Sequence, residues 1–170
     1  YLGYIQKGLS TMKFTVRKAV LEDCHRVLPL QTQISNLHFE GRPDIFKNEV
    51  RTYTEEQFQK WLDSPTHVLL IAEGNGEIAG YAFSWVISYR EHPTYRDFDS
   101  FYIDDLCVLE KFRRQGIGRA LIERCKAEAR LRNCKNVDLG VWSFNKDAIA
   151  FYESCGMRER TKRMEIDLEA

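Results

Sequence analysis

Two glycines and three arginines lie close together in the middle of the sequence, at a spacing that suits anion binding. Arg113, Gly116 and Gly118 fit the pattern R-x-x-G-x-G, and Arg114 and Arg119 add two more cationic side chains. Glycines let a backbone approach a ligand closely and adopt positive φ angles. Where such a turn opens a helix, amides and the positive end of the helix dipole point outward, which suits a pyrophosphate. The alternative is a helix-start turn whose glycines serve tight packing alone.

Two other phosphate-binding motifs do not match this turn. The Lys and Ser/Thr of a P-loop do not follow the glycines at the needed spacing, and the third glycine of a dinucleotide motif is missing. A nucleotide- or nucleic-acid-binding protein that uses the same arginine-rich turn remains an alternative. However, 25 Lys and Arg balance 25 Asp and Glu, which argues against a basic surface for nucleic acid or anionic lipid. We therefore expect neither nucleic acid nor membrane as a partner.

The cysteines favour reduced thiols over a metal site or a disulfide framework. Their number is odd, and no CxxC or CxxH spacing occurs; they are Cys24, Cys107, Cys125, Cys134 and Cys155. We therefore expect a cytoplasmic protein without a metal site. The apolar runs are too short to span a bilayer, and no secretory signal pattern opens the chain.

The elements around the turn follow from the hydrophobic periodicity. Helical spacing or helix-capping signals predict helices at 21–37 (kinked or broken at Pro29), 54–62, 117–131 and 145–154. Alternating and β-branched runs predict strands at 13–18, 67–73, 78–89, 100–109, 137–142 and 163–168, with a hairpin turn at 74–76. This order predicts an α+β fold with a mixed sheet, because the later helices must cross over between neighbouring strands.

The sequence predicts one domain preceded by a short N-terminal segment. Residues 13–170 are expected to form one domain, since no repeat or interdomain linker occurs in them. Residues 1–12 precede the first strand, and we expect them to be added expression residues or a disordered N-terminal extension.

A second motif lies downstream of the glycine-rich turn and adds specificity. Leu106 and Val108 precede the turn, and the later segment contains Asn145, Ala148, Phe151, Tyr152 and Gly156, followed by Met157. In these motifs the sequence resembles the GCN5-related N-acetyltransferase (GNAT) superfamily, which combines L-x-V, R-x-x-G-x-G and N-x-x-A-x-x-F-Y-x-x-x-G-F. Met157 replaces the common Phe. The match is strong from Tyr102 onward, and the element order agrees from Lys13.

The resemblance implies both a fold and an activity. The GNAT fold has a central mixed, mostly antiparallel sheet flanked by helices, with a splay at the acetyl-CoA site, here between 106–108 and 137–142. The implied activity is acetyl-CoA-dependent transfer, in which an amine attacks the thioester directly. A coenzyme A-binding sensor that lacks turnover is the alternative function.

The resemblance also implies cofactor-binding residues. The backbone of Leu106, Cys107 and Val108 would pair with the pantetheine arm like an added strand. The pyrophosphate would lie on the turn formed by Arg113, Arg114, Gln115, Gly116, Ile117, Gly118 and Arg119. Asn145 would contact the cofactor and also cap its helix.

Catalysis would need an acid and a base. The resemblance gives Tyr152 the role of donating a proton or hydrogen bond to the departing thiolate, although it could instead be a packing aromatic. Strand parity puts Asp104 on the face of Leu106 and Val108, and the polyamine acetyltransferases carry an acid at the matching position, so Asp104 is the candidate base. Asp105 and a water chain are the alternatives. Cys107 lacks an obvious His partner, so a buried structural thiol is favoured over an acetyl-cysteine nucleophile.

The acceptor amine is the least specified part. Candidates are a small-molecule amine, such as a polyamine, sugar amine or amino acid, and a protein or peptide amine. In the GNAT fold that the sequence resembles, the acceptor pocket is usually built by the region of the first two helices and by the loop after the strand 78–89. Both regions hold acids and aromatics suited to a cation, although ordinary polar loops have the same composition. Their residues are His38, Phe39, Glu40, Arg42, Asp44, Phe46, Tyr89, Glu91, His92, Tyr95, Asp97 and Asp99. The final strand could pair between chains and form a homodimer.

Overall fold

The computed structural model describes residues 13–50 and 52–168. By internal packing the chain divides into one unit that ends at Gly140 and a second that begins at Val141.

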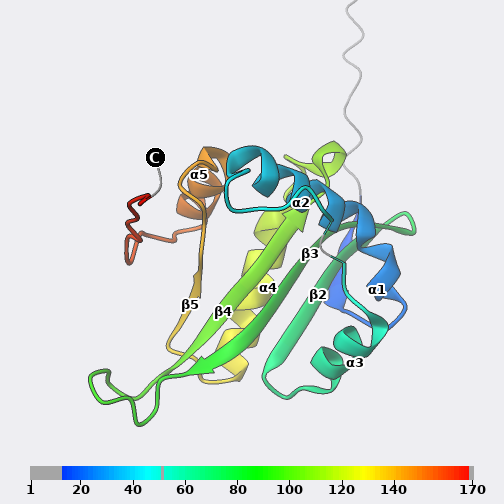
Figure 1. Cartoon of the computed structure of the whole chain (residues 1–170). Coiled ribbons are helices and arrows are strands. Elements are labelled where there is room, and N and C mark those ends of the chain that lie inside the picture. Colours follow the sequence, from blue (N-terminus) through cyan, green and yellow to red (C-terminus); the bar gives the residue numbers. More distant parts are fainter. Residues whose placement is uncertain (1–12, 51, 169–170) are drawn as a thin grey trace, which may run out of the picture. The chain divides into compact units, whose positions relative to one another are not determined.

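The first unit is built on a five-stranded mixed sheet (Figure 1). Its strands lie in sequence order: β1 (Thr15–Lys18), β2 (His67–Gly74), β3 (Glu77–Ser88), β4 (Asp99–Val108) and β5 (Asn136–Leu139). The first four pair antiparallel, and β5 pairs parallel to β4. The parallel pair requires a crossover, which α4 (Ile117–Leu131) supplies. The mixed, mostly antiparallel sheet predicted from the sequence is confirmed.

Helices cover both faces of this sheet. Figure 1 shows α4 behind the strands, with α1 (Asp23–Arg26) and α3 (Glu55–Asp63) in front. On the front face, Leu30 of α2 (Leu28–Gly41) and Phe58 of α3 pack in one buried cluster with Tyr81 and Phe83 of β3. A short 3₁₀ turn, η1 (Glu110–Phe112), follows β4.

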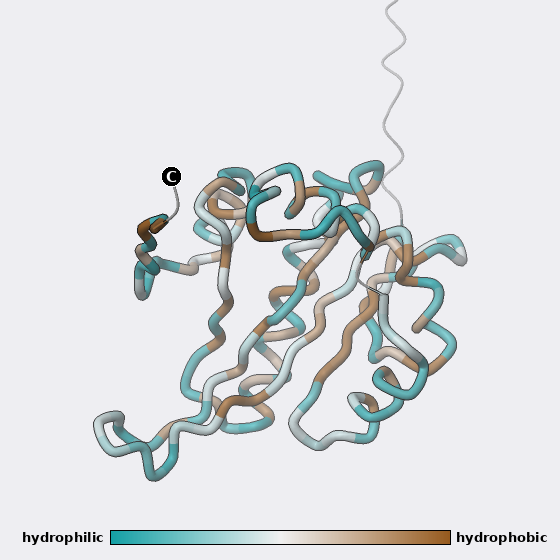
Figure 2. Tube along the Cα trace, viewed as in Figure 1, coloured by the Kyte–Doolittle hydropathy of each residue, from teal (hydrophilic) through white to brown (hydrophobic). Residues whose placement is uncertain are grey.

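Because both faces are covered, the central strands are apolar throughout. Every residue of Val68–Ala72 is buried, so β2 does not alternate between apolar and polar residues as a half-exposed strand would. Figure 2 shows this concentration of hydrophobic residues in the middle strands, while the long loop between β3 and β4 is mostly hydrophilic or neutral.

Three local structures predicted from short sequence signals are present in the structure. Thr54 caps α3 in a full capping box: its hydroxyl accepts from the Gln57 amide, and the Gln57 side chain accepts from the Thr54 amide, both at 3.2 Å. Asn75 and Gly76 both take positive φ in the β2–β3 turn, as an Asn-Gly hairpin requires. Pro29 lies in the first turn of α2, where it breaks the predicted 21–37 helix into α1 and α2.

A buried ion network ties the start of the chain to the sheet. Asp23 is fully buried and accepts two hydrogen bonds from Arg17, at 2.6 and 2.9 Å, and one from Arg26 at 2.9 Å. Both arginines also pair with Glu73 of β2. Burial opposes ionisation of Asp23, but the hydrogen bonds from Arg17 and the Val20 amide outweigh it and lower the pKa of the carboxyl.

The second unit contains α5 (Lys146–Ser154) and departs from the sequence prediction after it. The predicted closing strand at 163–168 is wrong: the structure assigns no strand there, and Met164, Ile166 and Leu168 are more than 80% exposed. An alternating pattern favours a strand, but a strand also needs a hydrogen-bonded partner. The predicted strand 137–142 is also shorter, since β5 ends at Leu139.

Candidate active site

The strand β4 separates from β5 halfway along its length. The β4–β5 pairing runs from Ser100 opposite Asn136 to Ile103 opposite Leu139, and there β5 ends. Within residues 13–50 and 52–168, no strand pairs with β4 beyond Ile103 on that side. The segment from Asp104 to Val108 therefore presents a strand edge to which an extended ligand chain can add. This is the expected splay.

A glycine packs β3 against this edge. A Cβ built on Gly80 would lie 2.8 Å from the Cys107 carbonyl oxygen, 3.2 Å from Val108 Cγ2 and 3.3 Å from Ile117 Cγ2. The contacts with Val108 and Ile117 show that the Val108 side chain faces α4. A side chain at this position would push β3, β4 and the start of α4 apart. Glycine at position 80 therefore permits the close packing that keeps the open edge in its position.

The glycine-rich turn opens α4 with amides directed outward. Gly116 takes φ 85° as the N-cap, and Arg114 also has a positive φ of 62°. The first hydrogen bond of the helix runs from the Ala120 amide to the Gly116 carbonyl at 3.0 Å. The amides at 117–119 come before it and therefore have no acceptor within the helix. Arg113, Arg114 and Arg119 are exposed around them. The turn has the geometry of an anion site at a helix N-terminus.

A bulge in β4 overturns the parity argument for Asp104. Asp105 pairs with Phe83 and Ile103 with Ser84, so Asp104 is the extra residue in β4. Such a bulge interrupts the strict alternation of side chains. Asp104 therefore lies on the face of Asp105 and Phe83, whereas Val108 faces α4. The expectation that Asp104 shares the face of Leu106 and Val108 is wrong, although its place in a cavity is consistent with a role at the site.

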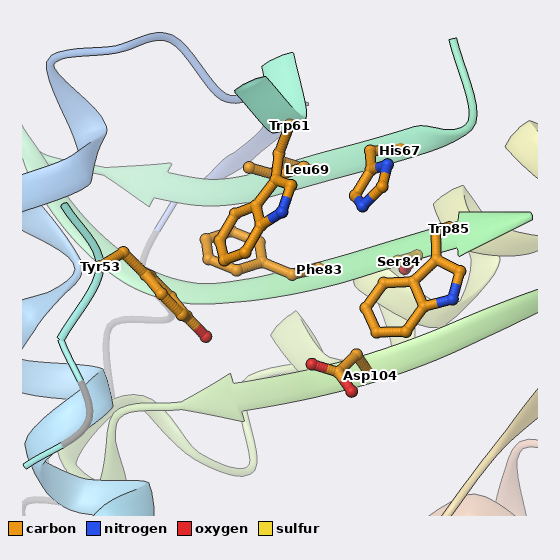
Figure 3. Close-up of a pocket in the computed structure, with 8 residues that line it drawn as sticks. All are labelled: Tyr53, Trp61, His67, Leu69, Phe83, Ser84, Trp85 and Asp104. Atoms are coloured by element: carbon orange, nitrogen blue, oxygen red, sulfur yellow. The ribbon is translucent and has the colours of Figure 1, made fainter. Parts of the chain in front are cut away.

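That face holds a cavity of about 260 Å³ in front of the sheet (Figure 3). Figure 3 shows Tyr53, Phe83, Trp85 and Asp104 directed toward the same space, with Asp104 reaching it from β4. Three elements supply most of the wall: α3, β2 and β3. The lining residues are Tyr53, Trp61, His67, Leu69, Phe83, Ser84, Trp85 and Asp104.

The aromatic walls of the cavity are packed against one another. Tyr53 contacts Trp61 edge-on with ring centroids 4.9 Å apart, and Phe83 lies 5.7 Å from Tyr53. Trp85 contacts Tyr102 at 5.3 Å. Rings fixed in this way lose little further side-chain freedom on binding, and the electron-rich face of an aromatic ring attracts a cation.

The charges around the cavity favour a cation as well. His67 lies between Trp61 and Trp85, and burial lowers its pKa, which favours the neutral ring near pH 7. Its Nδ1 is 2.9 Å from the Ser64 hydroxyl. Burial and the negative charge of Asp104 raise the pKa of Tyr102. Asp104 is the only charged carboxylate among the eight lining residues, and Lys and Arg are absent from those eight.

Two neighbouring groups are held firmly and do not line the cavity. Asp105 accepts a hydrogen bond of 2.5 Å from the hydroxyl of buried Tyr81. Cys107 is 5% exposed, and burial followed by the charge of Asp105 raises its pKa to about 12. A thiol with so high a pKa is a poor nucleophile at pH 7, which agrees with a structural role for Cys107.

Asn145 and Tyr152 lie in the second unit. The Asn145 side chain accepts a hydrogen bond from the Ala148 amide at 3.1 Å and so caps α5, as one of its two expected roles requires. Tyr152 lies on α5 with its ring 5.3 Å from that of Phe151. Their roles toward the cofactor remain predictions.

The residues proposed for the acceptor make contacts of their own. His38 stacks on Phe46, Arg42 pairs with Asp44, and His92 stacks on Tyr95. None of the twelve acceptor candidates is among the eight residues that line the cavity. Of the eight lining residues, the sequence predicted a functional role only for Asp104. The other seven come from the segment before α3 and from α3, β2 and β3, and they meet only through the pairing of strands and helices that are distant in sequence.

In 13–50 and 52–168, no three or more His, Cys, Asp and Glu side chains are grouped so that they could hold a metal ion. No helix in the same part of the chain has the length and apolar character needed to cross a membrane.

An open β4 edge beside an outward-facing helix start can take an extended ligand chain that carries an anionic group, as acyl-coenzyme A does. The family model described as the acetyltransferase (GNAT) family matches residues 32–157. The chain therefore belongs to the GNAT family of acetyltransferases, which use acetyl-CoA as co-substrate.

Curated relatives and solved structures agree with this assignment. The chain is 32% identical to thialysine N-epsilon-acetyltransferase from Sus scrofa over 86% of this chain and 85% of that protein. It is 29% identical to the ribosomal protein bS18 alanine N-acetyltransferase of Escherichia coli K12, over 74% of each chain. A crystal structure of a point mutant of the BH1408 protein from Bacillus halodurans matches with a TM-score of 0.86 at 31% identity, over 91% of this chain and 99% of that one.

The family assignment settles the class of reaction. The chain is an N-acetyltransferase that transfers an acetyl group to an amine. The alternative of a coenzyme A sensor without turnover finds no support among the relatives.

Proposed function

We propose that the acceptor is a primary aliphatic amine at the end of a narrow, flexible chain, as in a lysine-like amino acid. The observation that carries this proposal is the aromatic cavity with Asp104 in its wall. An ammonium group is attracted by aromatic faces and by a carboxylate, and here it meets no opposing Lys or Arg among the lining residues.

The size of the cavity supports a slender acceptor. Pockets for complete drug-sized ligands usually measure about 300–1,000 Å³. A cavity of about 260 Å³ is below that range and suits one amine-bearing chain better than a multi-ring sugar. The rest of the acceptor would remain outside the cavity.

The proposed cofactor contacts follow the open edge and the helix start. The backbone from Leu106 to Val108 would pair with the pantetheine arm, and the amides at 114–119 would hold the pyrophosphate. Arg113, Arg114 and Arg119 would add positive charge. Asn145 would contact the cofactor in addition to capping α5.

The proposed chemistry is one direct transfer. Asp104, directly or through water, accepts a proton from the ammonium group, so that the neutral nitrogen can attack the thioester carbonyl. The new C–N bond forms, the attacking nitrogen releases its second proton to solvent and, as the tetrahedral intermediate collapses, the C–S bond breaks. Tyr152 donates a proton or hydrogen bond to the departing thiolate, and amides near Val108 stabilise the oxyanion. Asp105 is the alternative base, but its bond to Tyr81 holds it outside the cavity lining.

A second acceptor class is supported by a specific relative. The E. coli relative is named as an alanine N-acetyltransferase of a ribosomal protein, which makes a peptide N-terminus a candidate acceptor here. The relative from Sus scrofa is named for the epsilon-amine of thialysine, which favours the lysine-like acceptor.

The proposal is tested with an amine panel and a thiol-release assay. The panel holds lysine, thialysine, spermidine, an aminoglycoside and a peptide that begins with Ala. We expect the highest kcat/KM for lysine or thialysine and weak or no turnover of the aminoglycoside. A marked preference for the peptide would favour the second acceptor class, and preference for the aminoglycoside would refute the slender acceptor.

The role of Asp104 has a matched control. Asp104→Asn keeps the size of the side chain but removes its charge, and we expect kcat/KM for the amine to fall roughly 10²-fold. Glu56→Gln removes an exposed carboxylate that pairs with Lys60 on α3 and should leave kcat/KM unchanged. An unchanged kcat/KM in Asp104→Asn would refute its role as base and cation partner.

Two broader assignments complete the proposal. One family model spans 32–157 without interruption, which supports a single N-acetyltransferase domain over 13–170. All five cysteines are free thiols, which supports a cytoplasmic, reducing environment.

A further inference from the structure

Gln33 of α2 connects the front-face helices to the end of the cofactor strand. Its side-chain Nε2 donates to the Val108 carbonyl at 3.0 Å, and its Oε1 accepts from the Glu110 amide at 2.9 Å. Nε2 is also 3.3 Å from Cys107 Sγ. One amide side chain thus bonds to two backbone groups on either side of Leu109, where β4 ends and η1 begins.

This arrangement holds the junction between two proposed cofactor-binding segments. Before the junction lies the 106–108 edge, and after it lies the turn at 113–119. The other side-chain bond that the structure assigns to the Val108 carbonyl comes from Arg113 Nε and is longer, at 3.4 Å. Gln33 is half-buried and lies 75 residues from Val108 in sequence, so the contact is a product of the fold.

We propose that Gln33 is a positioning residue for acetyl-CoA. By bonding both sides of the junction, it fixes the direction in which the chain leaves β4, and with it the spacing between the pantetheine edge and the pyrophosphate turn. An amide is suited to this task because it donates and accepts at once. This inference rests on the proposed cofactor contacts of 106–108 and 113–119.

The test compares variants of similar size in the full chain. Gln33→Met keeps the length and removes both hydrogen bonds, while Gln33→Glu keeps an acceptor for Glu110 but sets a carboxylate against the Val108 carbonyl. We expect both to weaken coenzyme A binding roughly 3- to 10-fold, the worth of about one net hydrogen bond. The acetyl-CoA KM should rise in step, and the amine KM should stay near the wild-type value.

A control on the same helix separates positioning from general damage. Thr32→Ala removes a hydroxyl that donates to the Leu28 carbonyl within α2, and its coenzyme A Kd should match wild type. Binding is measured by titration calorimetry well below the unfolding temperature of each variant. A Gln33→Met protein with a lower melting temperature but an unchanged Kd would overturn the proposal, as would equal rises in both KM values.

A measurement on the unmodified protein covers the case in which the variants do not fold. Amide hydrogen exchange at Glu110 should be slow because its amide donates to Gln33, and slower still with coenzyme A bound. Rapid exchange at Glu110, or exchange unaffected by coenzyme A, would overturn the inference. If the wild-type chain itself binds no coenzyme A, the proposed function fails first, so the two failures are distinguishable.

Discussion

Replacement of Gly80 by Ala should disturb the cofactor edge without touching any proposed catalytic group. The new Cβ would meet the Cys107 carbonyl oxygen at 2.8 Å, whereas ordinary contact begins near 3.4 Å, so β3 and β4 must separate by about 0.6 Å. The obstructing atom belongs to the backbone and cannot rotate away. Val108 Cγ2 and Ile117 Cγ2, at 3.2 and 3.3 Å, restrict movement in the other directions.

The expected magnitude follows from this overlap. Overpacking of a dense core costs about 1–3 kcal/mol. For a chain of this length, that lowers the melting temperature by roughly 2–12 °C. Since the displaced segment includes Cys107 and Val108, we also expect coenzyme A to bind roughly tenfold more weakly, because small misplacements at a site of close contact are costly.

Calorimetric unfolding and titration with coenzyme A measure the two effects in one preparation. The control is Glu56→Gln, which removes an exposed carboxylate that pairs with Lys60 on α3 and lies outside the segments proposed to bind the cofactor. It should melt and bind like wild type. An unchanged melting temperature in Gly80→Ala would refute the close packing, and a lower one with unchanged binding would refute the link between Gly80 and the cofactor edge.

Three further changes test other parts of the account. Gly116→Ala should lower stability by about 1–2 kcal/mol because its φ of 85° is left-handed, and it should weaken coenzyme A binding; unaltered binding in a titration would contradict the role of the turn. Trp85→Leu should raise the amine KM roughly 2- to 30-fold, the worth of a cation–π contact, with the acetyl-CoA KM unchanged as the internal control. Asp23→Asn should lower stability at pH 7 by about 1–3 kcal/mol through the lost bonds to Arg17 and Arg26. Because the folded pKa of Asp23 is below its ordinary 3.8, that stabilisation exists above 3.8 and is lost as the pH falls through the folded value, so wild type and variant should converge in acid melts.

Features set by neighbouring residues could be predicted from the sequence. The Thr54 capping box, the Asn75–Gly76 turn and the break at Pro29 depend on a few adjacent residues, and all formed. The motif pattern also identified the family, because two spaced motifs in the right element order are far more specific than either one.

Features set by pairing across the fold could not be predicted in the same way. The bulge at Asp104 depends on the register of β4 against β3, and it moved the aspartate to the opposite face from that predicted by alternation. The contacts of Gln33 and Gly80 with Val108 join residues that are distant in sequence. The segment 163–168 shows the reverse error, since alternation predicted a strand where the structure has none.

The most direct test of the central claim is the stoichiometry of transfer. The chain is incubated with acetyl-CoA and a lysine-like amine, and free thiol and acetylated amine are quantified together, by thiol titration and mass spectrometry. The account predicts equal amounts of coenzyme A and acetylated amine, with thiol release that depends on both the protein and the amine. Binding of acetyl-CoA without an acetylated product from any amine in the panel, or no binding at all, would contradict it.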